Sequence, residues 1–280
     1  MTPRLLDVPL TADGMRLDHF LARRFADRTR SWLARGIDGG GVRDAAGRPL
    51  RKANPVRAGM VLHLFLPGIA PGTEAPPLPT ILHEDDRIVV LDKPAGMLAH
   101  PAGTDFAWAA VSLARERWPG IDLVHRLDRD TSGVLVLARD IDTNRALKRI
   151  FHDGEAVKTY EALTRGEIGW DTAVLDGPIG PASGIIRIQM AVRPDGQSAR
   201  TDVRVIGRRP GCTHVALRLH TGRTHQIRVH LDHAGFPLLG DRMYGVPPEV
   251  FLRTLDIGVD ETVVIAAGAP RQALHARRVS

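Results

Sequence analysis

The chain has 280 residues, of which 43% are hydrophobic and 25% are charged. This length accommodates one large domain together with a small one, and the composition excludes a disordered or fibrous chain. No apolar run approaches the ~20 residues that a membrane-spanning helix requires, and the N-terminus lacks the apolar core of a signal peptide. Cys212 is the single cysteine, so an intrachain disulfide is excluded and a reducing cytoplasm is expected.

The excess positive charge is confined to the first quarter of the chain. Residues 1–66 contain 12 Arg or Lys against 6 Asp or Glu, whereas the remainder contains 26 of each. A small basic module on a neutral body is typical of a protein that binds a polyanion, most simply nucleic acid. A basic surface that only aids solubility is the alternative, and charge alone does not decide between the two.

The first predicted elements are two helices and a strand. Leu17, Leu21 and Phe25 recur at helical spacing, and a second helix is expected over residues 31–37, before three glycines break the chain. An apolar run at 61–66 then predicts a buried strand. Two helices followed by a small sheet, in a segment rich in arginine, resemble the small RNA-binding domain named after ribosomal protein S-four.

A proline-rich stretch separates this segment from the rest of the chain. Five prolines and two glycines lie from Pro67 to Pro79, a composition that suits neither a helix interior nor a central strand. We therefore expect a small domain over residues 1–67, an extended linker over 68–79 and a larger domain over 80–280.

Beyond the linker the pattern alternates between strands and helices. Helices are expected at 106–117, from Asp142 as N-cap to about Gly154, and at 224–234. Strands are expected at 88–91, 134–137, 158–163, 199–206 and 213–219. Strand runs with inserted helices favour an α+β fold over a βαβ dinucleotide-binding fold.

The stretch from His125 to Gly133 contains the first candidate for chemistry. Asp128 lies between Arg126 and Arg129, and a carboxylate flanked by cations stays ionised at neutral pH, as a nucleophile or general base requires. Turn-forming residues lead from it into an apolar strand, which places the carboxylate on a loop anchored by the core. Taken alone, the stretch is better explained as a charged surface turn.

A second candidate lies at residues 219–230, where a predicted strand ends and a helix begins. Backbone N–H groups at a helix start favour an anion, and Arg223 and Arg228 add fixed positive charge. Arg228 could form a bidentate pair with Asp128, which would orient the carboxylate and hold it deprotonated. It could instead pair with Asp232, four residues further along the same helix.

Tyr160 and the histidines supply the remaining candidates. Tyr160 is one of only two tyrosines, and on a strand it can offer a stacking face and a phenolic proton, or simply lie at the edge of the core. The spacing of His225, His230 and His233 matches no zinc-binding pattern, so we expect no metal or other cofactor. Asp130, two residues beyond the candidate carboxylate, could complete a hydrolytic carboxylate pair, but no further feature indicates a sugar site.

Taken together, these segments resemble the RluA-type pseudouridine synthases of ribosomal and transfer RNA. The motifs that carry the resemblance are Asp92 to Pro101, His125 to Gly133, Lys158 to Ala162, Asp176 to Gly180, Gly222 to His230, Gly240 to Gly245 and Ala273 to Ala276. They extend from about residue 80 to the end, and their shared order is very improbable by chance. The resemblance implies an α+β fold with a central mixed, mostly antiparallel sheet, flanking helices and a cleft.

The resemblance also implies the catalytic residues. Asp128 would be the catalytic carboxylate, Arg228 its basic partner, and Tyr160 the residue that packs on the target base and assists proton transfer at C5. The reaction breaks the N1–C1′ bond of uridine, rotates the base and joins C5 to C1′, so it requires no cofactor. An ionised aspartate can attack C1′, add to C6 or abstract a sugar proton, and the sequence does not choose among these steps.

Four further residues are expected to bind the substrate. The resemblance implies that Arg126 enters the RNA stack in place of the flipped uridine and that Ile227 lines the base pocket, while His125 and Arg223 lie in the same motifs. Flipping the uridine costs a few kcal/mol, which an inserted arginine and a stacking tyrosine would offset. We expect large-subunit ribosomal RNA as the partner, with transfer RNA as the alternative, and a monomer that needs neither membrane nor metal.

Two other functions stay open, and each makes a different prediction. A non-catalytic RNA-binding or assembly factor on the same scaffold predicts loss of the acidic residue or its basic partner, and both are present. A metal-dependent phosphodiesterase acting on RNA predicts an activity that a chelator abolishes. Members of the family usually continue into at least one more apolar strand after the Leu-His-Ala motif, so a shortened sheet edge or an altered C-terminus is expected here.

Overall fold

The computed structural model describes residues 3–25, 30–66, 76–101 and 109–280. The chain divides into two compact units. Unit 1 comprises residues up to 78 together with 100–117, and unit 2 comprises 79–99 together with 118–280. Most of the linker expected at 68–79 lies outside the described residues.

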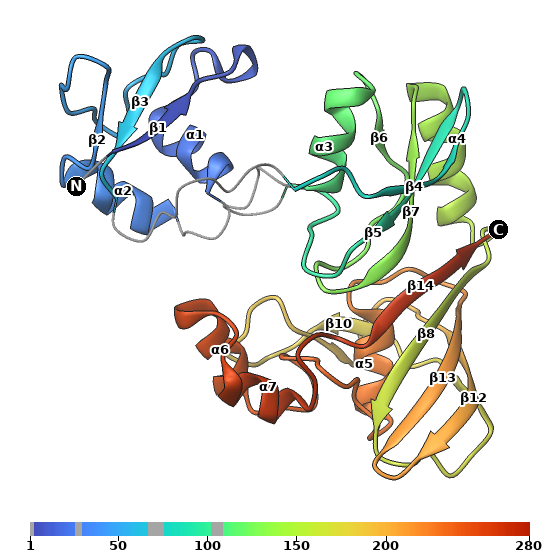
Figure 1. The fold of residues 1–280 in the computed structure, drawn as a ribbon. Coiled ribbons are helices and arrows are strands. Elements are labelled where there is room, and N and C mark those ends of the chain that lie inside the picture. Colours follow the sequence, from blue (N-terminus) through green and yellow to red (C-terminus); the bar gives the residue numbers. More distant parts are fainter. Residues whose placement is uncertain (1–2, 26–29, 67–75, 102–108) are drawn as a thin grey trace. The chain divides into compact units, whose positions relative to one another are not determined.

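Unit 1 contains helices packed on a three-stranded antiparallel sheet (Figure 1). Helices α1 (Leu17–Arg24) and α2 (Arg30–Asp38) lie where the helical spacing predicted them. The strand expected at 61–66 is β3 (Val61–Leu64), which is central between β1 (Arg4–Asp7) and β2 (Val42–Arg43). A short 3-10 helix (Leu10–Ala12) follows β1, and α3 (Ala110–Arg117) covers the described part of the helix expected at 106–117.

One apolar core holds the first two helices against the sheet of unit 1. Leu17, Leu21, Leu33 and Leu62 are fully buried in it. Each buried leucine stabilises the unit by about 1.5–3 kcal/mol relative to an exposed one. The i, i+4 spacing that predicted α1 is therefore the spacing of its buried face.

Unit 2 is built on a mixed sheet that has nine strands within the described ranges (Figure 1). The strand order is β4-β5-β7-β14-β8-β13-β12-β9, with β6 paired beside β7. The strands are β4 (Thr80–Glu84), β5 (Ile88–Lys93), β6 (Asp122–Leu123), β7 (Ser132–Ala138), β8 (Lys158–Arg165), β9 (Thr172–Leu175), β12 (Thr201–Arg209), β13 (Cys212–Leu219) and β14 (Leu274–Val279). A separate hairpin consists of β10 (Ile179–Pro181) and β11 (Met190–Val192). The mostly antiparallel sheet with flanking helices confirms the expected α+β class.

The strand nearest the C-terminus lies in the middle of this sheet. β14 is parallel to β7 on one side and antiparallel to β8 on the other. The strand that contains the Leu-His-Ala motif is thus an interior strand, because residues 274–279 lie between β7 and β8. The shortened sheet edge or altered C-terminus beyond this motif stays a prediction. Where β7 pairs with β14, Gly133 has φ +111°, and a Cβ there would lie 2.2 Å from the carbonyl oxygen of Ala276. Only glycine fits this approach.

Four helices accompany the sheet of unit 2 in the described ranges: α4 (Ile141–His152), α5 (Gln226–His233), α6 (Pro248–Ile257) and α7 (Glu261–Ala267). The N-cap of α4 is Asp140 rather than the predicted Asp142. Its Oδ1 accepts the backbone N–H groups of Asp142 at 3.0 Å and Thr143 at 2.8 Å, contacts that only the residue before the first helical turn can make. None of the helices in the described ranges has the length and apolar character needed to cross a bilayer.

Candidate active site

Asp128 lies on the loop that joins β6 to β7. A hydrogen bond from the backbone N–H of Thr131 to the Asp128 carbonyl, at 3.2 Å, closes the turn that begins at Asp128. The carboxylate retains 30% of its side-chain exposure, so a ligand can reach it. Its Oδ2 accepts a hydrogen bond from Nη1 of Arg228 at 3.0 Å. The predicted pairing of these two residues is thus confirmed.

The bidentate partner of Arg228 is a different carboxylate. Arg228 is buried on α5, and it donates through Nε to Asp241 Oδ2 at 2.7 Å and through Nη2 to Asp241 Oδ1 at 3.0 Å. The predicted bidentate pair with Asp128 is therefore wrong: one edge of the guanidinium fork is occupied by Asp241, which leaves Nη1 for Asp128. The hydrogen bonds of Arg228 go to these two carboxylates rather than to Asp232, the alternative partner on the same helix.

Asp241 anchors this network from a fully buried position. Its Oδ1 also accepts the backbone N–H groups of Met243 at 2.9 Å and Tyr244 at 3.2 Å. Burial raises the pKa of the Asp241 carboxyl, but the charge and hydrogen bonds of Arg228 outweigh burial and lower the pKa overall. For Arg228 burial lowers the pKa, and the charge of Asp241 raises it by more. Both groups therefore stay ionised, and the cation is held rigidly toward Asp128.

Tyr160 lies on β8 and is buried. Burial raises the pKa of its phenol, and the negative charge of the nearby Asp128 raises it further. The phenol therefore keeps its proton at neutral pH. Tyr160 can offer an aromatic face and a proton to a group bound beside the carboxylate.

Lys93, the last residue of β5, forms hydrogen bonds that hold the loop carrying Asp128 in place. Its side chain is completely buried, and its Nζ donates to the carbonyl oxygens of Pro94 (2.9 Å), Met97 (2.7 Å) and Arg129 (3.0 Å). Burial lowers the pKa of Lys93 to about 8, although the charges of Asp130 and Asp128 oppose this shift. The ammonium thus ties the segment after β5 to the residue that follows Asp128.

His225 and Tyr244 lie beside the Asp128–Arg228 pair. Nε2 of His225 is 4.0 Å from Oδ2 of Asp128, and its Nδ1 is 2.9 Å from the Tyr244 hydroxyl. The guanidinium of Arg228 lies over the ring of Tyr244, 4.8 Å from its centroid. This stacking adds a cation–π contact to the salt bridges that hold the guanidinium.

The remaining predicted site residues differ in their surroundings. The ring of His125 stacks on Phe151, with centroids 4.7 Å apart, and its Nε2 accepts the backbone N–H of Val136. Such packing favours a role in holding the loop against β7 over direct contact with a substrate. Arg126 is exposed two residues before Asp128, whereas Ile227 is buried beside Arg228 in sequence. Arg223 is exposed and donates through Nε to the carbonyl of Ser198.

Sequence reasoning gave no role to Asp241, Tyr244, His225 or Lys93. The first two lie in the quoted motif at residues 240–245, and Lys93 lies in the motif at 92–101, so the motifs contained them without indicating what they contact. One usable signal was available. The chain has only two tyrosines, and the one that is not Tyr160 is Tyr244.

The described residues contain no group of three or more His, Cys, Asp or Glu side chains arranged to hold a metal ion. His230, one of the three histidines considered for such a role, is buried. It contacts the Thr201 hydroxyl through Nδ1 and the Gly177 carbonyl through Nε2, each at 2.9 Å. Its ring therefore joins α5 to neighbouring backbone.

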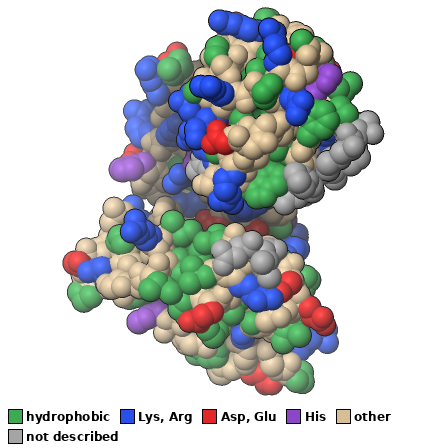
Figure 2. All heavy atoms as spheres, turned by 90° about the vertical axis from the view of Figure 1, so that its left-hand side faces the viewer, with side chains coloured by type: hydrophobic (Ala, Val, Ile, Leu, Met, Phe, Trp, Pro, Cys, Tyr) green, Lys and Arg blue, Asp and Glu red, His purple; other side chains and the backbone are tan. Residues whose placement is uncertain are grey.

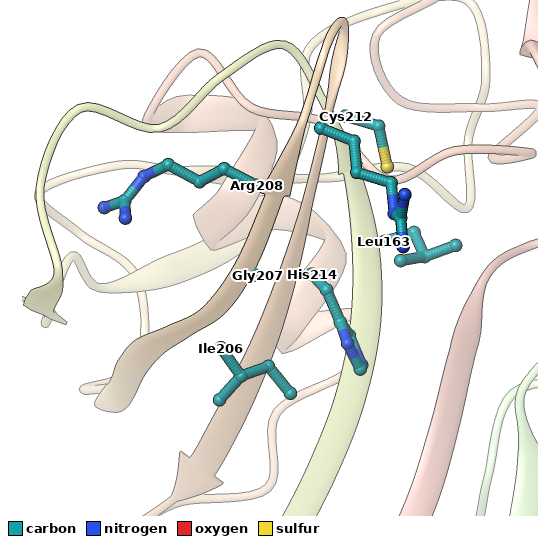
Figure 3. Close-up of a pocket in the computed structure, with 7 residues that line it drawn as sticks. Leu163, Ile206, Gly207, Arg208, Cys212 and His214 are labelled. Carbon is teal, nitrogen blue, oxygen red and sulfur yellow. The ribbon is translucent and has the colours of Figure 1, made fainter.

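A pocket of about 330 Å³ lies elsewhere on unit 2, beside the β12–β13 hairpin (Figure 3). Leu163 and His214 line it, on the neighbouring strands β8 and β13. Side chains alternate between the faces of a strand, so Leu163 lies on the face opposite Tyr160. This pocket is therefore separate from the Asp128 cluster.

The arrangement around Asp128 suits acid–base or nucleophilic chemistry on a bound group. The accessible carboxylate is oriented by a buried cation, and a protonated phenol lies nearby. A carboxylate of this kind can act as a nucleophile or accept a proton, and the phenol can donate one. None of these steps transfers an electron or requires a group donor.

Known proteins with similar sequences share one activity in their names. Residues 87–233 match the sequence model of the RNA pseudouridylate synthase family. Ribosomal large subunit pseudouridine synthase D of Pseudomonas aeruginosa is 37% identical, over 99% of this chain and 87% of that protein. An uncharacterized RNA pseudouridine synthase of Chloroflexus aurantiacus is 40% identical, over 86% of this chain and 79% of that protein.

Solved structures give the same result. Human RNA Pseudouridylate Synthase Domain Containing 1 superposes with a TM-score of 0.59 at 25% identity, covering 74% of this chain and 80% of that one. Human RNA Pseudouridylate Synthase Domain Containing 4 superposes with a TM-score of 0.54 at 27% identity, covering 71% and 82%. Asp128, Tyr160 and Arg228 all fall within the residues that the family model matches.

Proposed function

Because this chain belongs to the RNA pseudouridylate synthase family and is an RNA pseudouridine synthase of the RluA type, we propose that Asp128 is its catalytic carboxylate and that large-subunit ribosomal RNA is its substrate. The enzyme cleaves the N1–C1′ bond of a uridine, turns the base and joins C5 to C1′. Substrate and product have the same atoms, so nothing else is consumed.

The observation that carries the catalytic proposal is the three-residue network of Asp128, Arg228 and Asp241. Attack on C1′, addition to C6 and abstraction of a sugar proton all require a carboxylate that is accessible and held in one direction. Asp128 is partly exposed, and Arg228 contacts it from a buried position that Asp241 fixes. The network therefore supports each of the three first steps.

The base is held by residues around this carboxylate. A uridine must leave its stack to reach Asp128, which costs a few kcal/mol. In our proposal Arg126, exposed on the same loop, fills the vacated place in the RNA, and Ile227 lines the base pocket. Tyr160 packs on the base, and its protonated phenol assists the exchange of protons at C5. Arg223 contacts the RNA backbone.

Replacing Asp128 with asparagine tests the catalytic role. We expect D128N to form no pseudouridine while RNA affinity is retained, because the amide keeps the shape of the carboxylate and loses its basicity. D130N is the matched control, since it removes a carboxylate of the same loop that lies 3.7 Å from Arg242. Carbodiimide mapping or mass spectrometry of RNA from a complemented deletion strain gives the readout. Restoration of the modification by D128N would contradict the proposal.

The substrate proposal rests on relatives and on charge. Similar proteins from Pseudomonas, Xanthomonas and Xylella carry the name ribosomal large subunit pseudouridine synthase D. Pseudouridine maps of ribosomal and transfer RNA, with and without this gene, would locate the target. A missing pseudouridine in transfer RNA alone would replace the ribosomal assignment with the alternative one.

Residues 1–67 are proposed to form an S-four-like RNA-binding domain that strengthens this binding. Two helices beside a small sheet support the proposal, and Figure 2 shows basic side chains gathered on one face of unit 1. Arg23 and Arg35 are exposed on α1 and α2. The double variant R23E/R35E should raise KM for RNA, leave kcat unchanged and reduce the salt dependence of binding. Unchanged binding at every salt concentration would contradict the assignment.

Two further proposals concern the cellular setting. A cytoplasmic location is supported by the RNA substrate and by the single cysteine. Fractionation of cells expressing a tagged chain would test it. That the enzyme acts as a monomer remains a prediction, which light scattering of the purified protein would check.

A further inference from the structure

His225 has a strained backbone next to the catalytic carboxylate. Its φ of +57° is the only positive value at a non-glycine residue among the described residues. A left-handed conformation is unfavourable for a residue with a Cβ, so the surrounding contacts must hold it in place. It is the residue immediately before α5, three positions ahead of Arg228. In this conformation the ring has Nε2 4.0 Å from Asp128 Oδ2 and Nδ1 2.9 Å from the Tyr244 hydroxyl.

Hydrogen bonds at Tyr244 favour one of the two neutral forms of the His225 ring. The Tyr244 hydroxyl accepts the backbone N–H of Met190 at 2.9 Å, and the same oxygen is 2.9 Å from Nδ1 of His225. With an incoming donor already bound, the hydroxyl proton is available for Nδ1. Nδ1 is then the acceptor, and Nε2 carries the hydrogen.

The contact between Nε2 and Asp128 disfavours the other tautomer, in which Nδ1 carries the hydrogen. A proton on Nδ1 would leave a lone pair on Nε2 facing Oδ2 of Asp128, 4.0 Å away. A lone pair and a carboxylate oxygen repel each other, whereas an N–H and a carboxylate oxygen attract. Both ends of the ring therefore favour the Nε2–H form.

His225 is neutral in these surroundings. Burial lowers its pKa, and the charge of Arg228 lowers it further, against the opposing effects of Asp128 and Asp241. Burial raises the pKa of Tyr244, so its hydroxyl keeps the proton that it donates. A neutral imidazole adds a directed donor to the site without adding a charge.

We propose that His225 is a positioning residue for Asp128: Tyr244 orients its ring, and its Nε2–H and the Arg228 guanidinium address the same carboxylate oxygen, Oδ2. The other oxygen, Oδ1, then faces the uridine. The 4.0 Å separation is about 1 Å longer than a hydrogen bond. Contacts of this kind often tighten when a substrate enters the site and excludes water. The inference rests on the proposed role of Asp128.

Two substitutions at position 225 separate the donor from the backbone strain. Glycine accepts a positive φ and removes the ring, whereas glutamine retains an N–H donor at a similar distance from the backbone. We expect H225G to lower kcat by roughly tenfold to a hundredfold, because a misplaced reacting group costs about that much. KM for RNA should stay within about twofold of wild type, and H225Q should recover most of the lost kcat. Thermal unfolding would verify that both variants are folded.

The tautomer itself can be measured without substrate. Long-range proton–nitrogen correlation spectra of the full-length enzyme, labelled with nitrogen-15 at histidine, distinguish protonated from bare ring nitrogens. We expect Nε2–H at His225 from about pH 5 to 8, and assignment would come from comparison with H225Q. In Y244F the ring of residue 244 remains but the fixed Nδ1 partner is lost, so the signals should shift toward a mixture of tautomers.

Several results would overturn the proposal. They are a proton on Nδ1 in the wild-type enzyme, an imidazolium that titrates between pH 5 and 8, or an H225Q variant no faster than H225G. An H225G variant with wild-type kcat would do the same. Full activity of D128N would instead overturn the proposed role of Asp128, so the two failures are distinguishable.

Discussion

Replacing Asp241 with asparagine should destabilise unit 2 and slow turnover. Asp241 neutralises the charge of the buried Arg228 and orients its guanidinium toward Asp128. Its Oδ1 accepts three donors, namely Nη2 of Arg228 and the backbone N–H groups of Met243 and Tyr244. An asparagine would keep its oxygen there and turn its NH₂ toward Nε of Arg228, where Oδ2 now accepts at 2.7 Å. One charge-assisted hydrogen bond is lost, and two donors face each other.

The size of this effect follows from burial. Removing one partner of a buried ion pair costs about 3–5 kcal/mol, and the remaining bond from Arg228 to Asp128 argues for about 3 kcal/mol here. For a unit of this size that loss corresponds to a fall in Tm of roughly 6–12 °C. The kcat should fall by roughly tenfold or more, since Arg228 no longer holds Asp128 in one direction.

Chemical or thermal unfolding and a pseudouridine assay together test this reasoning. D232N is the matched control. Asp232 lies on α5 with Arg228, and burial and the charge of Asp241 raise its pKa, so neutralising it should cost little. If D241N unfolds within about 1 kcal/mol of wild type and retains full kcat, the buried pair does not position Arg228 and the reasoning is refuted.

Three further perturbations have defined outcomes. Lys93 has a pKa of about 8 in the folded state against its ordinary 10.5, so between these pH values the native state binds fewer protons than the unfolded state. The unfolding free energy of the wild type should therefore rise from pH 8 to 10.5, by up to roughly 3 kcal/mol. Urea titrations of K93M should lack this rise. Y160F should keep RNA affinity but lower kcat roughly a hundredfold in single-turnover assays, because the protonated phenol is lost; unchanged kcat would exclude a proton role. G133A should lower the free energy of unfolding by on the order of 3 kcal/mol or prevent folding, because its Cβ would clash with the Ala276 carbonyl. Tm and soluble yield would measure this. G169A is the control and should be neutral, since a Cβ there has no atom within 4 Å.

Local periodicity accounts for the elements that were predicted correctly. Leu17 and Leu21 lie one turn apart on the buried face of α1, and the apolar run at 134–137 lies in β7, which has strands on both sides. These signals depend on burial of the segment itself. β14 was missed because Leu274–Val279 contains a histidine and two arginines, and its central place depends on its neighbours β7 and β8.

In the candidate site, too, some residues could be predicted from the sequence and others could not. Asp128 and Arg228 were predicted as a pair because each lies in a motif with a recognisable charge pattern. Sequence reasoning offered Asp128 and Asp232 as partners of Arg228 and did not consider Asp241, which is the bidentate partner in the structure. All three carboxylates are compatible with the pattern, and only distances in the folded chain distinguish them.

The sequence by itself determined the family and the fold class and led to the proposal of Asp128 as the carboxylate, because ordered motifs and burial periodicity are properties of the chain. Tertiary structure alone decided what holds that carboxylate. Three interactions join residues from different elements: the bidentate salt bridge of Asp241 with Arg228, the hydrogen bonds of Lys93 to two loops, and the contact of Tyr244 with His225. Such contacts depend on angles and distances of a few ångströms, which residue spacing does not encode.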